Sequence, residues 1–125
     1  MCLRLEDDAH YFSIASEDII CYKVILEKDS DYFTPYHCSE IAIGGLYNSK
    51  IDVRFDFNIY TVEQALHSFC NLVDAQRLHS GFNTSEFTYR IVKCCIPQGS
   101  TYYKGWFQIL ASYASDKLRY DEIIY

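Results

Sequence analysis

Residues 51–59 read IDVRFDFNI, with apolar and polar side chains in strict alternation. A period of two residues is typical of a β-strand that buries one face and exposes the other to water. Two further stretches, 19–28 (IICYKVILEK) and 86–96 (EFTYRIVKCCI), are rich in β-branched and aromatic residues, and they also predict strands. Weaker strand patterns lie at 40–43, at 102–107, where a tight loop is the alternative, and at 117–125.

The strongest helix pattern covers residues 62–79. Thr61 and Gln64 fit a capping box, in which the two side chains satisfy free amides at the start of a helix. Apolar residues follow at helical spacing, and Gly81 is a natural helix stop. We therefore expect one long helix after the strand at 51–59.

Together these patterns predict an α+β fold, with a mostly antiparallel sheet of about five or six strands and one main helix packed on one face. The length of 125 residues fits a single domain that spans 1–125. We expect an arm or a short helix at 1–17, a turn at 97–100, and a short helix or a loop at 109–115.

Composition narrows the choice of partner. The net charge is −6 and no cluster of Lys and Arg occurs, so double-stranded nucleic acid is a poor partner. No apolar run approaches the roughly 18 residues that cross a bilayer, and no signal peptide opens the chain, so we expect a cytoplasmic protein without membrane contact. A small anionic ligand in a local pocket or a host protein fits this charge, and a homo-oligomer stays open.

Motifs of common catalytic and metal sites are missing from the sequence. The six cysteines form no CxxC pair, so we expect reduced thiols that pack as small apolar groups. No two of the four histidines have the spacing of a helical metal site, and a zinc site at His37-Cys38 is the minor alternative. Phosphate-binding glycine motifs and a nucleophile elbow are also missing. We therefore predict no metal, no cofactor and no catalytic residue.

The candidate binding surface surrounds the turn at 97–100. A rigid Pro-Gly turn presents its neighbours at little entropic cost, aromatic faces stack on planar ligands, and nearby cations attract an anion. The alternative is a hairpin whose aromatic side chains pack on the core. The predicted ligand-binding residues are Tyr22, Arg90, Ser100, Tyr102, Tyr103, Lys104 and Trp106.

An early strand with Tyr22-Lys23, the stretch IVKCCIPQGSTYYKG at 91–105 and a closing strand with Glu122 resemble small uncharacterised proteins of phages and gut bacteria. More distantly, this order is similar to the ADP-ribosyltransferase layout. That resemblance implies NAD as substrate and Glu122 as the group that orients its ribose. Lys23 stands where that family has Arg or His, and only Tyr60-Thr61 lies near its middle motif.

Two functions follow from these observations. The first is a small, phage-type binding protein that sequesters a nucleotide or binds a host protein, without enzymatic activity. The alternative is a divergent ADP-ribosyltransferase-like enzyme that uses NAD.

Overall fold

The computed structural model describes residues 3–5, 11–35, 38–56, 59–81 and 88–125. These residues form thirteen β-strands and one α-helix. The elements are β1 (Leu3–Leu5), β2 (Ser13–Ile14), β3 (Ile19–Lys28), β4 (Asp31–Phe33), β5 (Glu40–Ile41), β6 (Leu46–Asn48), β7 (Asp52–Asp56), β8 (Ile59–Gln64), β9 (Leu66–Phe69), α1 (Leu72–Gly81), β10 (Thr88–Ile96), β11 (Thr101–Phe107), β12 (Leu110–Ser115) and β13 (Lys117–Ile123).

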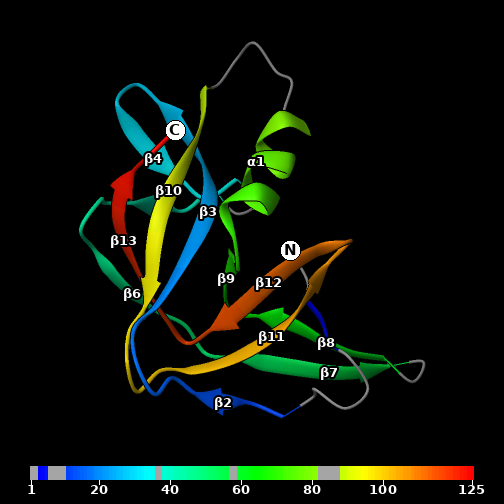
Figure 1. Cartoon of the computed structure of the whole chain (residues 1–125). Coiled ribbons are helices and arrows are strands. Elements are labelled where there is room, and N and C mark those ends of the chain that lie inside the picture. Colours follow the sequence, from blue (N-terminus) through cyan, green and yellow to red (C-terminus); the bar gives the residue numbers. More distant parts are fainter. Residues whose placement is uncertain (1–2, 6–10, 36–37, 57–58, 82–87) are drawn as a thin grey trace.

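The strands form one antiparallel sheet that curls into an open half-barrel. Ten of them follow one another in the order β6-β13-β10-β3-β9-β12-β11-β1-β8-β7, and β2, β4 and β5 extend it at the side. Figure 1 shows β3, β10 and β13 standing upright in one wing, while β7, β8 and β11 cross below them in the other. Helix α1 packs beside the upright wing, against β3 and β10.

The predicted α+β class is therefore wrong. The described chain is mostly strand, with one helix of only ten residues, and its sheet has about twice the predicted number of strands. Many of the additional strands are two to four residues long, too short for a periodic pattern to reveal them.

The strongest strand predictions are confirmed. β3 has the predicted bounds, and β10 covers 88–96 of the predicted strand at 86–96, whose first two residues lie outside the described chain. In the pattern at 51–59, β7 covers 52–56, and residues 57–58 lie outside the described chain. The turn is also confirmed, because the Ser100 backbone N–H donates to the Pro97 carbonyl at 3.1 Å and Gly99 has a φ of +86°.

The long helix at 62–79 is wrong in its first half. Residues 62–69 lie in β8 and β9, where Val62 faces Leu3 of β1 and Phe69 faces both Tyr22 and Ser112. These partners are distant in sequence, and their pairing overrides the local helical pattern. The helix starts only at Leu72.

Two weaker predictions also need correction. The segment at 109–115 forms strand β12, which pairs with β11 and β9, instead of a helix or loop. In the segment at 1–17, where we expected an arm or a short helix, the described residues include strands β1 and β2, and residues 1–2 and 6–10 lie outside the described chain.

Buried side chains form three clusters in the curled sheet. The first joins β3, β10 and β13 around Ile25 and Tyr120. The second joins β3, β9, β10 and β12 to α1 around Ala75. The third lies in the lower wing around Leu3 and Val62. In the described part of the chain, no helix is long and apolar enough to cross a membrane.

Candidate functional site

The aromatic residues that follow the turn are largely used for packing. Tyr102 packs on the first cluster and meets the Tyr113 ring edge-on at 5.7 Å, while Tyr103 packs on the third cluster. The two neighbours therefore face opposite sides of β11, as a strand requires. Trp106 is 40% exposed, and Lys104 is exposed. The two most accessible members of the predicted surface are thus Lys104 and Trp106.

The other predicted binding residues lie apart or are already paired. Ser100 is fully buried and its hydroxyl donates to the Pro97 carbonyl at 2.6 Å. Arg90, near the other end of β10 from the turn, donates to the Tyr125 carbonyl at 2.9 Å and pairs with Glu27 at 3.2 Å. Its guanidinium is therefore engaged within the fold.

Tyr22 and Glu122 also lie away from the turn. Tyr22 packs on the second cluster, on the helix side of the sheet. Glu122 is exposed on β13, opposite Lys93 of β10. The structure does not gather the seven predicted binding residues into one site.

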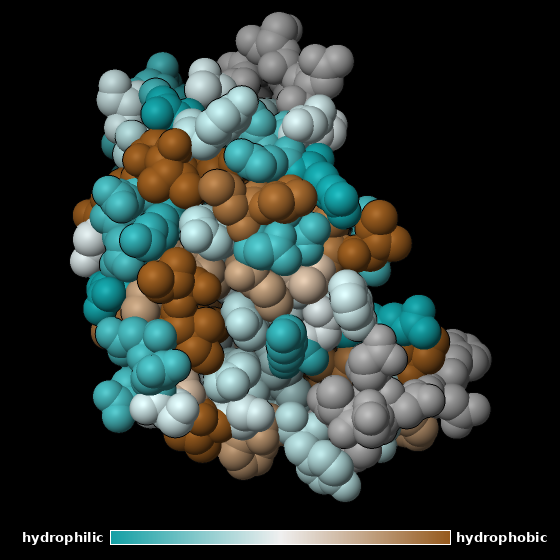
Figure 2. Space-filling model, in the orientation of Figure 1, coloured by the Kyte–Doolittle hydropathy of each residue, from teal (hydrophilic) through white to brown (hydrophobic). Residues whose placement is uncertain are grey.

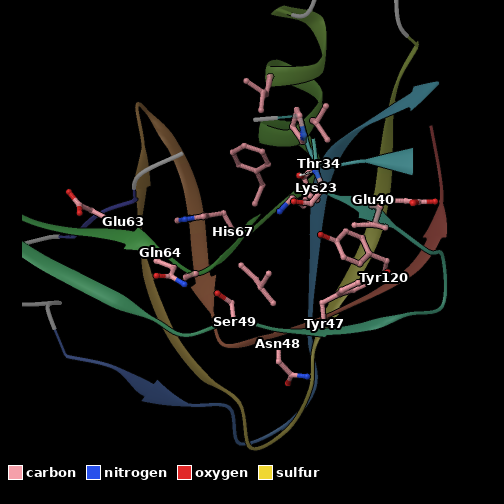
Figure 3. Close-up of a pocket in the computed structure, with 18 residues that line it drawn as sticks. Lys23, Thr34, Glu40, Tyr47, Asn48, Ser49, Glu63, Gln64, His67 and Tyr120 are labelled. Carbon is pink, nitrogen blue, oxygen red and sulfur yellow. Dashed lines mark hydrogen bonds between the residues drawn. The ribbon is translucent and has the colours of Figure 1, made fainter. Parts of the chain in front are cut away.

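A cavity of about 450 Å³ lies elsewhere, inside the curl of the sheet. Figure 3 shows side chains from β3, β6, β9, β13 and α1 converging on it. By contrast, the face in Figure 2 carries its apolar side chains as separate patches among polar ones. The apolar residues that line the cavity are Val24, Pro35, Ile41, Tyr47, Ala65, Leu66, Phe69, Leu78 and Tyr120. The polar residues that line it are Lys23, Thr34, Ser39, Glu40, Asn48, Ser49, Glu63, Gln64 and His67.

Lys23 is the only cation among these lining residues. It lies in the middle of β3, is partly buried, and directs its amine into the cavity on the side of His67 (Figure 3). Among the described residues, none forms a hydrogen bond or ion pair with this amine. Burial lowers the pKa of Lys23.

Tyrosines form one wall of the cavity. Tyr120 is 1% exposed, and burial raises its pKa well above the ordinary value, so its hydroxyl stays protonated. Its ring meets that of Tyr47 edge-on at 5.5 Å. The Tyr47 hydroxyl accepts a hydrogen bond from the Ala42 backbone N–H at 2.7 Å, which fixes the ring in place. This wall is therefore rigid and aromatic, with one buried hydroxyl beside the cavity.

The two carboxylates of the lining lie at its exposed margin. Glu40 and Glu63 are both exposed, and Glu63 accepts a hydrogen bond from Arg54 at 3.3 Å. His67 lies deeper, at 8% exposure, on β9. The cavity thus combines an apolar interior, an unpaired amine and a polar margin.

The thiols of the described residues form no disulfide bond. Five cysteines, Cys21, Cys38, Cys70, Cys94 and Cys95, are free, and Cys2 lies outside the described residues, as does His37 of the minor zinc alternative. Burial raises the pKa of Cys21 to about 12, which keeps its thiol protonated. Within the described ranges, no three His, Cys, Asp or Glu side chains come together as a metal ion requires.

Sequence reasoning missed this cavity. It treated Lys23 only as a departure from another family's motif, and it treated the histidines as surface or turn residues, with a zinc site at His37-Cys38 as the minor alternative. A usable signal was present, because Lys23 interrupts an otherwise mostly apolar strand at 19–26. Lysine is almost never buried without a partner, so its position in such a strand indicates an internal polar site.

No family model matches the chain, and neither a curated protein nor a solved structure is similar to it.

Proposed function

We propose that this chain is a binding protein for a small, mostly apolar molecule with one acidic group, which occupies the cavity and pairs with Lys23. The observation that carries the proposal is the unpaired Lys23 amine in the wall of a cavity of about 450 Å³. Small-molecule sites commonly span roughly 300–1,000 Å³ and combine an apolar lining with a few placed polar groups.

The acidic group follows from the cost of burying an ammonium ion. A charged amine removed from water is destabilised unless a partner compensates it, and the described residues supply none to Lys23. An incoming carboxylate or sulfonate pairs with the ammonium and offsets that cost. The apolar body of the ligand would meanwhile lie against residues such as Leu66 and Phe69.

A matched pair of fluorescent probes tests this proposal. 1-Anilinonaphthalene-8-sulfonate carries one negative charge, and 1-anilinonaphthalene has the same ring system without it. We expect Lys23→Met to weaken binding of the charged probe about 10- to 100-fold, which is the effect of losing one hydrogen bond to a charged group. Binding of the neutral probe should change little.

Lys104→Met is the control, because Lys104 is exposed on β11 and does not line the cavity. It should leave both affinities unchanged. The proposal fails if the charged probe does not bind the wild-type protein, or if Lys23→Met leaves its affinity intact. A loss of binding in Lys104→Met alone would place the anion site at the turn instead.

A further inference from the structure

The Lys23 amine combines three properties that favour covalent chemistry. It lies against an apolar cavity, no ion pair with a described residue holds it as ammonium, and the aromatic rings of Tyr47 and Tyr120 line the same cavity. A lysine amine removed from water in an apolar pocket is a known type of nucleophile toward carbonyl groups.

We infer that the cavity also captures small apolar aldehydes covalently, as an imine on the Lys23 Nζ. This inference rests on the proposed ligand cavity and adds a second class of ligand to it. An acidic ligand pairs with the amine in its protonated form, whereas an aldehyde reacts with the neutral form.

The reaction is a condensation that needs no oxidant or reductant. The Nζ lone pair attacks the aldehyde carbon and forms a C–N bond, while the carbonyl π pair moves to oxygen, which takes a proton. Nitrogen loses a proton to give a carbinolamine. The hydroxyl then leaves as water with a proton from solvent, nitrogen loses its second proton, and a C=N bond remains. One amine and one aldehyde thus give one imine and one water.

Position distinguishes Lys23 from lysines on the surface. Exposed amines such as those of Lys50, Lys104 and Lys117 lie in water on the surface, outside the apolar cavity. Burial lowers the pKa of Lys23, so a larger fraction of its amine is neutral. The cavity also concentrates an apolar aldehyde next to that amine, which favours reaction there.

The test uses 2-naphthaldehyde with sodium cyanoborohydride, which reduces an imine to a stable secondary amine. Intact mass spectrometry of the full chain should show one naphthylmethyl group per molecule, and peptide mapping should place it on Lys23. Excess 1-anilinonaphthalene-8-sulfonate should reduce the yield several-fold by occupying the same cavity.

Lys23→Arg is the matched variant, because it keeps a cation but removes the reactive amine. We expect it to lose the adduct. Lys104→Arg, which lies outside the cavity, should keep both the adduct and binding of the sulfonate probe. Equal labelling of the exposed lysines, or an adduct in Lys23→Arg at the wild-type level, would overturn the inference. If Lys23→Arg does not fold, the competition experiment on the wild-type protein decides, since undiminished labelling contradicts reaction inside the cavity.

The two proposals fail in different ways. If the sulfonate probe does not bind the wild-type protein, the proposed function is wrong. If it binds but Lys23 gains no adduct, only the covalent inference is wrong.

Discussion

Asp74→Ala should destabilise the protein by about 1–4 kcal/mol, because the Asp74 carboxylate joins the start of α1 to the sheet. One of its oxygens, Oδ2, accepts hydrogen bonds from the Asn71 side-chain amide at 3.2 Å and from the Ala111 backbone N–H at 3.0 Å. The residue is 8% exposed. Loss of an acceptor for a partly buried amide costs about 1–3 kcal/mol, and loss of a carboxylate near a helix N-terminus adds about 0.3–1 kcal/mol.

Urea denaturation followed by circular dichroism measures this change. A thermal melt should show a fall in melting temperature of roughly 4–16 °C, because about 1 kcal/mol corresponds to roughly 4 °C for a domain of this size. Arg77→Ala is the control, because the Arg77 side chain is 62% exposed and its Nη1 lies 3.7 Å from Asp74 Oδ1. An exposed ion pair of this kind contributes about 0–1 kcal/mol. A loss below about 0.5 kcal/mol in Asp74→Ala, or an equal loss in Arg77→Ala, would refute this account of the helix start.

Three further predictions concern the stability effect of single substitutions. Lys23→Met should stabilise the ligand-free protein by about 1 kcal/mol at neutral pH. The pKa of Lys23 is lower in the folded protein than in the unfolded chain, so the unfolded chain binds more protons between the folded pKa and 10.5. The stability of the wild-type protein therefore rises with pH in this window, and the stability advantage of the variant should shrink. Urea melts in which this advantage stays constant with pH would contradict the prediction. Tyr47→Phe should cost about 1 kcal/mol in the same melts, because its hydroxyl accepts the Ala42 N–H at 2.7 Å, and an unchanged midpoint would show that this bond contributes nothing. Gly105→Ala should cost about 1–3 kcal/mol or more, because a Cβ there collides with the Arg4 carbonyl oxygen between β11 and β1; wild-type stability would mean that β1 moves away freely.

Strands were predictable where the signal was local and long. The stretch at 19–28 has enough β-branched and aromatic residues to indicate a strand, and it forms β3. The turn at 97–100 was predictable for the same reason, since Pro and Gly restrict the backbone directly. Short strands such as β5 and β6 carry no such signal, because their structure depends on partners elsewhere in the chain.

The helix shows how two local signals can compete. Thr61 and Gln64 match a capping box, but the helix is capped at Asn71, whose Oδ1 accepts a hydrogen bond from the Asp74 backbone N–H at 2.9 Å. Residues 62–69 have apolar positions that fit a helix, yet they supply β8 and β9. Without them, β1 and β12 would each lack a hydrogen-bonded neighbour in the sheet. Backbone groups inside a sheet must be paired, so this long-range requirement decides the structure of 62–69.

The cavity could not be predicted from the sequence, but its central residue could have been. Its walls come from β3, β6, β9, β13 and α1, and they meet only because β9 pairs with β3 and β6 pairs with β13. No periodicity encodes those pairings. Lys23, however, breaks the apolar pattern of its own strand, and nothing in the described fold compensates its charge. A residue that violates a local rule without a structural gain marks a functional position. For Lys23 the missing compensation is an anion or a carbonyl group, which makes this amine the position where a ligand of the protein should be sought.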